Sequence, residues 1–324
     1  MEMPPDRPVI PPLLVLAMGI LAVSTASIFI RYAQQDVPSL VIAAWRLTLA
    51  TLILAPIAYT RQRKELTSLR RRELGLALLS GFFLALHFAT WISSLEYTTV
   101  TSSVVLVTTT PLWVALFSPY ILKEPITRLV MFGMILALIG GIIIGLSDTC
   151  TTVGMRLVCP PFGDFIRGDA FIGDLLAVTG AIMAAAYVII GRRLRSSMSL
   201  IGYIFLVYGM AALVLVAIMI VSGEPAFGYP PTAYLWMFLL ALIPQLFGHS
   251  SFNWALKYLS AAYVSITLLG EPIGTTILAY ILLGETPSGM KIFGAILILF
   301  GIYIASQSEL RRNRREVQSS LEAL

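Results

Sequence analysis

The chain has 324 residues, of which 58% are hydrophobic and 12% are charged, and its mean hydropathy is +0.87. Soluble globular proteins carry about 25% charged residues, so this composition excludes an ordinary soluble domain. The net charge of +5 does not indicate nucleic-acid binding, because the basic residues lie in short loops between apolar segments.

Apolar segments long enough to cross a bilayer follow one another along nearly the whole chain. Each is predicted to be a helix, because backbone polar groups cannot stay unpaired in lipid. The first five are expected at residues 13–33, 38–60, 74–95, 100–121 and 128–147. Five more are expected at 172–191, 200–221, 234–254, 261–283 and 289–307. No cleavable signal peptide is indicated, because the first segment follows a short proline-rich start and nine more come after it.

The two sets of segments repeat one another at a constant offset of 161 residues. The pairs are Arg31 and Arg192, Tyr97 and Tyr258, Pro111 and Pro272, Glu124 and Glu285, Gly133 and Gly294, and Gly140 and Gly301. An odd number of crossings in each copy inverts the second copy relative to the first. Inverted repeats are typical of secondary transporters, whose substrate site lies between the halves near the midplane. The expected fold is an all-α polytopic membrane protein with ten transmembrane helices in two inverted five-helix repeats.

The repeats divide the chain into four parts. We predict a first repeat at 13–147, an outward-facing loop at 148–171, a second repeat at 172–308 and a basic cytoplasmic tail at 309–324. The loop contains both cysteines, Cys150 and Cys159. A disulfide between them would suit a periplasmic or extracellular surface, and two free thiols are the alternative.

Orientation follows from the distribution of the 22 lysine and arginine residues. On the side of the predicted loop at 148–171, the only basic residues are Arg31, Arg156, Arg167 and Lys291. Arg46 lies inside a predicted span, and all the others fall on the opposite side. Cytoplasmic loops carry the excess of basic residues, so both termini are expected in the cytoplasm and the protein in a plasma (bacterial inner) membrane.

A motif recurs in both halves. A helix rich in small residues carries a central proline (Pro111, Pro272), ends near an acidic residue (Glu124, Glu285) and is followed by a helix with a Gly-x-x-Leu sequence at Gly133 and Gly294. Residues 99–145 and 259–306, which carry this motif, resemble the EamA domain of the drug/metabolite transporter superfamily. Arg46, early in the second segment, also matches the family, whereas the second copy has Val207 at that position. The resemblance implies transport of a small metabolite such as an amino acid, nucleoside, sugar or amine.

Ionisable residues inside a membrane are rare and costly, so Arg46 and Glu271 are candidate solute-binding residues. Arg46 could bind a carboxylate or phosphate, or it could be structural and pair with helix-end carbonyl groups. Glu271 directly precedes Pro272 and could couple flux to protons or bind a cationic solute. The alternative for Glu271 is a hydrogen-bonded carboxyl group that holds helices together.

Further candidates lie on other predicted spans. His87 and His249 are the only histidines and do not align in the repeat, since His87 aligns with Gly248. Either could change charge near neutral pH or bond between helices, and two histidines without further ligands do not make a metal site. Trp91 and Tyr187 would suit a flat or cationic solute if they face one cavity, although aromatic residues also line membrane interfaces. The remaining pathway candidates are Thr110, Pro111 and Pro272.

Structural roles are expected for four residues. Glu124 and Glu285 would each lie beside a helix N-terminus, and Gly133 and Gly294 would lie in helix contacts. The leading interpretation is a secondary-active or facilitative transporter of small polar metabolites, most simply an exporter, working by alternating access. Its expected partners are a small solute, the lipid bilayer and protons as a possible coupling ion, with no cofactor and no nucleic acid. A non-transporting scaffold or sensor is an alternative. An intramembrane enzyme is disfavoured, because no HExxH or GxSxG motif is present.

Overall fold

The computed structural model describes residues 8, 10–123, 126–149, 151–153, 156–158, 168–284, 286–301, 303–304 and 307. Its first half contains α1 (Pro12–Val23), α2 (Ala26–Ala33), α3 (Ser39–Arg61), α4 (Arg63–Ser68), α5 (Arg71–Tyr97), α6 (Val100–Val107), α7 (Thr110–Ile121) and α8 (Arg128–Thr149). Its second half contains α10 (Asp169–Arg195), α11 (Leu200–Val221), α12 (Pro231–Leu240), the π-helix η1 (Ala241–His249), α13 (Ser250–Ala255), α14 (Ala261–Thr267), the 3-10 helix η2 (Leu268–Gly270) and α15 (Glu271–Leu283). A further helix covers Gly289–Gly301.

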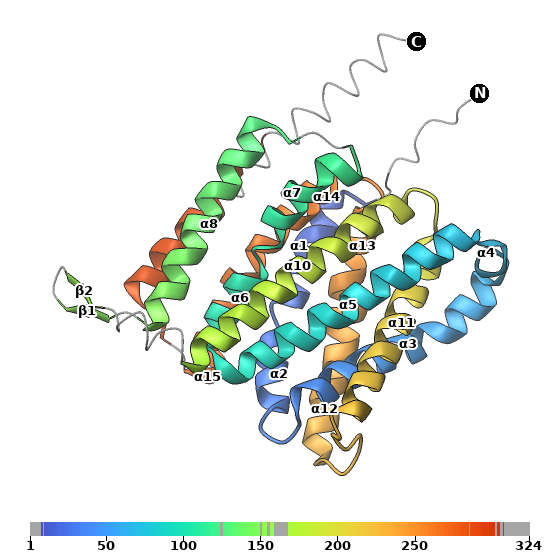
Figure 1. Ribbon diagram of the computed structural model, residues 1–324, viewed down its shortest axis with the longest axis horizontal. Helices are drawn as coiled ribbons and strands as arrows, with labels where there is room; N and C mark the ends of the chain where they lie inside the picture. The colour runs from blue at the N-terminus through green and yellow to red at the C-terminus, as the bar shows by residue number, and fades with distance from the viewer. Residues whose placement is uncertain are drawn as a thin grey trace, which may run out of the picture.

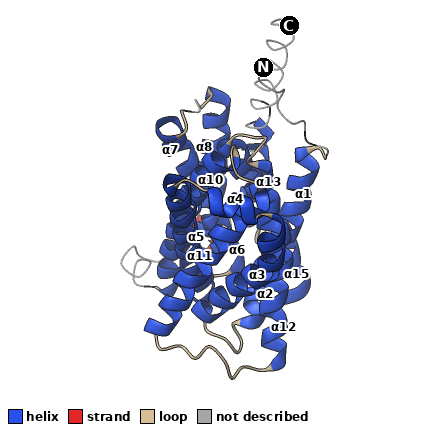
Figure 2. Ribbon diagram, turned by 90° about the vertical axis from the view of Figure 1, so that its right-hand side faces the viewer, coloured by secondary structure: helices blue, strands red, loops and turns tan. Residues whose placement is uncertain are grey.

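The fold is a bundle of long apolar helices, as predicted (Figures 1 and 2). Eight helical segments are long and apolar enough to cross a bilayer: Pro12–Ala33, Ser39–Arg61, Arg71–Tyr97, Ser102–Ile121, Asp169–Arg195, Leu200–Val221, Pro231–Ala255 and Ala261–Leu283. The apolar helices Arg128–Ile143 and Gly289–Gly301 fall below that length within the described residues. The all-helical membrane fold is therefore confirmed, and the full set of ten spans stays a prediction.

The segment between the halves contains two short strands that were not predicted. Strand β1 (Thr151–Val153) pairs antiparallel with β2 (Arg156–Val158). Each strand has only three residues, which is too short for a clear strand pattern in the sequence. Cys150 and Cys159 lie outside the described residues, so their predicted disulfide stays a prediction.

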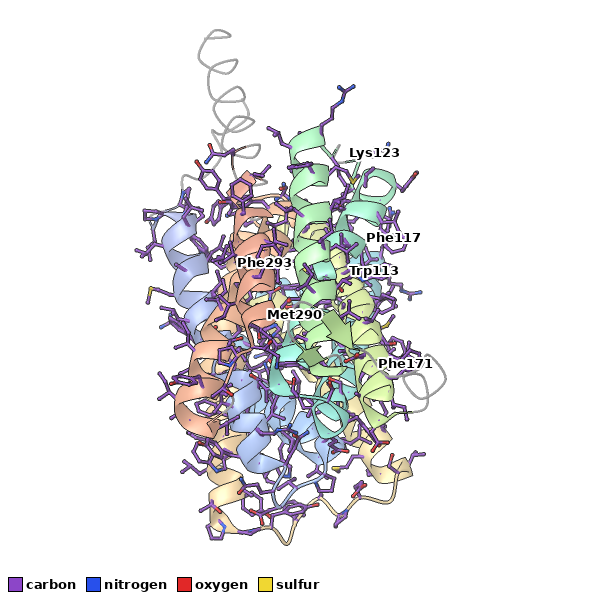
Figure 3. The ribbon with its side chains drawn as sticks, turned by 90° about the vertical axis from the view of Figure 1, so that its left-hand side faces the viewer. Trp113, Phe117, Lys123, Phe171, Met290 and Phe293 are labelled. Carbon is purple, nitrogen blue, oxygen red and sulfur yellow. The ribbon has the colours of Figure 1, made fainter. Side chains whose placement is uncertain are left out.

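The centre of the bundle is formed by α5, α10, α3 and α11. Helix α10 packs along α5, and α11 packs against both α3 and α5. The outside of the bundle is apolar, as lipid contact requires. Phe117 of α7 and Phe293 of the last helix, for example, are 40% and 55% exposed on the outer surface (Figure 3).

The sequence repeat reappears as a repeated contact. Nη1 of Arg31, near the end of α2, donates a hydrogen bond to the carbonyl oxygen of Leu95. Nη1 of Arg192, near the end of α10, donates to the carbonyl oxygen of Leu256 at 2.8 Å. Both donors and both acceptors are repeat partners, so the two halves join the ends of corresponding helices in the same way.

Helix α8 and the helix at Gly289–Gly301 touch through glycines. A Cβ atom on Gly140 would lie 2.5 Å from the carbonyl oxygen of Gly294, and one on Gly301 would meet the carbonyl oxygen of Gly133. The later residue of one helix therefore meets the earlier residue of the other, so the two helices run antiparallel. The expected packing role of Gly133 and Gly294 agrees with this contact, whereas Glu124 and Glu285 lie outside the described residues.

Candidate functional site

Two membrane-spanning segments are broken near their middle. The first breaks between α6 and α7 at Thr108 and Thr109. The second breaks at η2, a single 3-10 turn between α14 and α15. Pro111 and Pro272 each lie in the first turn of the half-helix that follows, where the missing N–H of proline has no intrahelical acceptor to lose. Broken helices that expose backbone groups at membrane depth are tolerated where they border a cavity or other protein.

A third break was not predicted. It separates α1 from α2 at Ser24 and Thr25, two adjacent polar residues in an apolar run. Ser24 Oγ donates to the carbonyl oxygen of Glu271 at 3.3 Å, and Thr275 Oγ1 donates to the carbonyl oxygen of Ser24 at 3.2 Å. The break in the first span is thereby joined to the start of α15. The adjacent serine and threonine were the available sequence signal.

The span made of α12, η1 and α13 contains a nine-residue π-helix, Ala241–His249. Pro244 lies inside it and cannot donate a backbone hydrogen bond. A π-helix is rare and often marks a functional site, because its wider winding changes which side chains share a face. Here it places Gln245 in the buried centre of the bundle and lets His249 border the central cavity.

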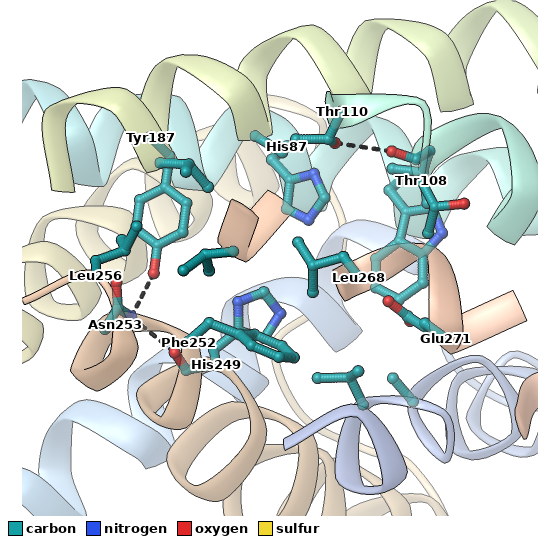
Figure 4. Close-up of a pocket in the computed structure, with 17 residues that line it drawn as sticks. His87, Thr108, Thr110, Tyr187, His249, Phe252, Asn253, Leu256, Leu268 and Glu271 are labelled. Atoms are coloured by element: carbon teal, nitrogen blue, oxygen red, sulfur yellow. Dashed lines mark hydrogen bonds between the residues drawn. The ribbon is translucent and has the colours of Figure 1, made fainter. Parts of the chain in front are cut away.

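A cavity lies among these broken and rewound helices (Figure 4). The volume of the cavity is about 50 Å³, which is enough for only a few water-sized groups. The lining comes from both halves of the chain: Val23, Ala26, His87, Trp91, Val107, Thr108, Thr110, Ala184, Tyr187, Val188, His249, Phe252, Asn253, Leu256, Val264, Leu268 and Glu271.

The two histidines, which do not align in the repeat, face one another. Their ring centroids are 6.4 Å apart. Nδ1 of His87 lies 2.9 Å from the carbonyl oxygen of Gly180, so Nδ1 carries the proton and Nε2 is the free nitrogen. The ring of His87 also stacks on Trp91 at 5.8 Å. His249 has no hydrogen-bond partner for its ring among the described residues, and it borders the same cavity.

Glu271 is the carboxylic acid of the cavity. Its side chain is 8% exposed, and its carboxylate makes no hydrogen bond within the described part of the chain. It is the first residue of α15, directly before Pro272. A buried carboxylate without a protein partner is costly unless a ligand, water or proton compensates it. This arrangement leaves the carboxylate available to a ligand, a water molecule or a proton.

Arg46 lies behind the cavity wall and not in it. Nε donates to Oε1 of Gln245 at 2.9 Å, and the guanidinium carbon lies 4.1 Å from the ring centroid of Phe88. Nη1 and Nη2 are buried and have no hydrogen-bond partner in the structure. Glu271 is an opposite charge that interacts with Arg46 electrostatically, although no direct ion pair between them occurs in the described structure. The position favours a structural and electrostatic role over direct solute contact.

A polar network closes the end of the cavity opposite Glu271. Nδ2 of Asn253 donates to the hydroxyl group of Tyr187 and, at 2.9 Å, to the carbonyl oxygen of His249. The backbone carbonyl of Asn253 accepts a hydrogen bond of 2.9 Å from Nε of Arg195, whose side chain is 3% exposed. The sequence places Arg195 in the loop after the span predicted at 172–191, whereas helix α10 continues to this residue.

Six of the nine predicted pathway residues border the cavity, namely His87, Trp91, Thr110, Tyr187, His249 and Glu271. Arg46 lies behind Phe88, as described above. Pro111 borders a separate and smaller cavity near Gly141, and Pro272 borders neither of the two. Both prolines lie at the start of a half-helix, and their predicted place in the pathway stays a prediction. The other eleven lining residues, among them Thr108, Phe252 and Asn253, were not among the nine.

The family model of the EamA-like transporter family matches residues 10–146 and again residues 171–307. The chain belongs to the EamA-like transporter family. It is 23% identical over 300 residues to an uncharacterized transporter of Archaeoglobus fulgidus, which covers 91% of this chain and 97% of the relative. It is 22% identical over 296 residues to a pseudopaline exporter of Pseudomonas aeruginosa, with 90% and 95% covered.

A solved crystal structure of a protein has the same fold. Its TM-score is 0.69 at 18% identity, and the match covers 93% of this chain and 98% of that one. The family and the curated relatives are transporters and not enzymes. The predicted membership in this family and the predicted transport role are thereby confirmed, with a small solute and the bilayer as partners.

Proposed function

We propose that this EamA-like transporter is a secondary carrier of small polar metabolites that works by alternating access around the central cavity. The carrying observation is a buried carboxylate, Glu271, that faces a cavity between two broken helices. Substrate sites in secondary transporters are typically built from such discontinuous helices at the interface of two repeats. The cavity in this structure is small, so a solute must bind in a more open arrangement of the two halves.

The proposed movement requires the halves to be related by a two-fold axis in the membrane plane. The antiparallel glycine contacts between α8 and the helix at Gly289–Gly301 support this relation. The repeated Arg31 and Arg192 contacts support a common architecture of each half. Ten spans, in repeats at 13–147 and 172–308, with both termini in the cytoplasm of a bacterial inner membrane, complete the proposal.

Export is the proposed direction, and the Pseudomonas aeruginosa relative is likewise an exporter. Energy could come from protons that bind Glu271 or from the solute gradient alone. Glu271 can exchange a proton with the cavity, because its side chain borders the cavity and its carboxylate makes no hydrogen bond in the described structure.

Solute flux into proteoliposomes tests the proposal. The panel contains amino acids, nucleosides, sugars and organic amines, each with and without an imposed pH gradient. We expect saturable flux of one class that is lost or strongly reduced in Glu271→Gln. A panel that shows no flux under any gradient would contradict carrier function and favour a scaffold or sensor.

A further inference from the structure

The central cavity has two chemically different ends. Glu271 lies at one end and Tyr187 at the other, with His87, His249 and Leu268 between them (Figure 4). A solute that fills the cavity must therefore satisfy two different sets of hydrogen-bonding groups. The identity of the free donors and acceptors at each end restricts the chemistry of that solute.

The end at Glu271 offers acceptors. The carboxylate of Glu271 makes no hydrogen bond with any described residue. Thr108 Oγ1 donates to the carbonyl oxygen of Val105 at 2.9 Å, so its free lone pairs are acceptors. Among the lining residues, Glu271 is the only acidic one, and none is a lysine or arginine. This end suits a cationic hydrogen-bond donor.

The end at Tyr187 offers a donor. Its hydroxyl oxygen already accepts from Nδ2 of Asn253, and the hydroxyl proton has no acceptor within the described structure. Tyr187 is 5% exposed, so this proton cannot bond to bulk water. A hydrogen-bond acceptor on the solute would satisfy it.

Aromatic rings form part of the lining of the cavity. Trp91 and Phe252 contribute ring surfaces, and His87 stacks on Trp91 with an interplanar angle of 12°. In its neutral form His87 presents the lone pair of Nε2, because Nδ1 donates to Gly180. Aromatic faces attract organic cations as well as flat apolar groups.

The buried arginine does not convert this cavity into an anion site. Phe88 lies against the guanidinium group of Arg46, which does not border the cavity. A carboxylate in the cavity would meet the negative charge of Glu271 without a direct bond to Arg46. Arg46 is instead an opposite charge that lowers the electrostatic cost of a charged Glu271 in this buried region.

We propose that the cavity, once the movement of the two halves has opened it, binds a solute with an ammonium group held by Glu271, a flat body against the aromatic rings of the lining, and a hydrogen-bond acceptor held by Tyr187. This inference rests on the proposed carrier function and names the substrate class of the same site. Glu271 would bind the positively charged group of the solute, and Tyr187 would donate a hydrogen bond to the acceptor at the other end of the solute.

Calorimetric titration of the purified full-length protein in detergent tests the inference with three matched probes. Tyramine has the ammonium group, the ring and a hydroxyl group. Phenethylamine lacks the hydroxyl group, and 3-(4-hydroxyphenyl)propanoate replaces the ammonium group with a carboxylate. We expect tyramine to bind best, phenethylamine to bind a few-fold more weakly, and the propanoate neither to bind nor to compete. These comparisons need no variant and so do not depend on refolding.

Variants then assign the residues. Glu271→Gln is expected to weaken tyramine binding about 30-fold or more, because a buried charge pair is lost. Tyr187→Phe is expected to weaken tyramine binding about 2- to 10-fold and to leave phenethylamine unchanged. Glu224→Gln, in the loop between α11 and α12, is the matched control and should bind all probes as the wild type does. Thermal unfolding curves identify any variant that does not fold.

Three results would overturn the inference: tyramine does not bind, the propanoate binds the wild type as tightly as tyramine, or Glu271→Gln binds tyramine normally. Flux into proteoliposomes separates this failure from that of the carrier proposal. Transport of an anionic or neutral solute, with no amine transported, would contradict the ammonium inference and leave carrier function intact. Tyramine binding without flux of any solute would contradict carrier function and leave the ammonium inference intact.

Discussion

At the residue scale, the carboxyl group of Glu271 is the main determinant of the proposed chemistry. It faces the cavity with Arg46 behind the wall and with His87 and His249 on the neighbouring surfaces. If it carries the coupling proton, the flux that remains in Glu271→Gln should not respond to an imposed pH gradient. Proteoliposome flux with and without the gradient measures this, with Glu224→Gln as the control. Full pH dependence in Glu271→Gln would assign coupling to a histidine or to no proton at all.

Gln245 is predicted to stabilise the buried charge of Arg46. Its Oε1 is the acceptor of the only hydrogen bond that the guanidinium group makes in the described structure. Gln245→Leu should therefore lower the free energy of unfolding by about 1.5–3 kcal/mol, since a bond to a charged group is lost. Gln245→Glu should be at least as stable as the wild type, because a carboxylate is a better acceptor. Thermal unfolding in detergent measures both, and equal stability of the leucine variant would contradict this role.

Several cavity residues could be identified from the sequence, because placing an ionisable side chain inside the membrane costs free energy. An ionisable side chain inside an apolar span is rare and costly, and this rule selected Glu271, His87 and His249, all of which border the cavity. The same rule selected Arg46, and it could not show that this side chain would pack on Phe88 and Gln245 outside the lining of the cavity. A residue's depth in the membrane follows from counting along the chain, whereas the face that it shares with other helices depends on packing.

At the element scale, the π-helix explains why the histidines do not align in the repeat. The residue that aligns with His87 is Gly248, yet His249 is the residue that faces His87. The equivalent stretch of the first half lies inside the continuous helix α5, whereas η1 is wound with i to i+5 hydrogen bonds. Counting residues at the α-helical period therefore predicts Gly248, and not His249, as the residue that faces His87. Pro244 was the only sequence signal for the change of winding.

The contact between α8 and the last helix depends on the absence of side chains. Gly140→Ala would place a Cβ atom 2.5 Å from a backbone oxygen that cannot move away as a side chain can. We expect it to lower the free energy of unfolding by about 1–3 kcal/mol through overpacking. Gly75→Ala in α5 is the control, because a Cβ atom there meets nothing within 4 Å and alanine favours the helix by about 0.5–1 kcal/mol. Similar thermal unfolding midpoints for the two variants would contradict the contact.

At the scale of the whole molecule, the proposed orientation is directly testable. Thr67 lies exposed in α4 and Thr232 lies exposed at the start of α12, at opposite ends of the proposed spans. In a background without Cys150 and Cys159, Thr232→Cys should react with a membrane-impermeant maleimide in intact cells. Thr67→Cys should react only after the membrane is opened. The opposite pattern would place both termini outside.

The overall architecture was largely predictable because lipid removes most alternatives. Hydropathy and length located the spans from Pro12–Ala33 to Ala261–Leu283 within a few residues, and the repeat offset matched their order. The breaks at Ser24 and at η2 were less predictable, because serine, threonine and glycine also occur in unbroken helices. Strands β1 and β2 lie outside the apolar spans, where the bilayer imposes no such constraint.

The crossed glycine contacts have a consequence for how such a chain could arise. Gly133 contacts Gly301, and Gly140 contacts Gly294. Because Gly133 aligns with Gly294 and Gly140 with Gly301, both halves use the same two repeat positions in the contact. That is the geometry of an isologous interface, in which a surface is complementary to itself. Two identical five-helix chains, inserted in opposite directions, would form this contact without any adaptation. Fusion of two such genes would then need no new interface, only loop charges that fix the direction of each half.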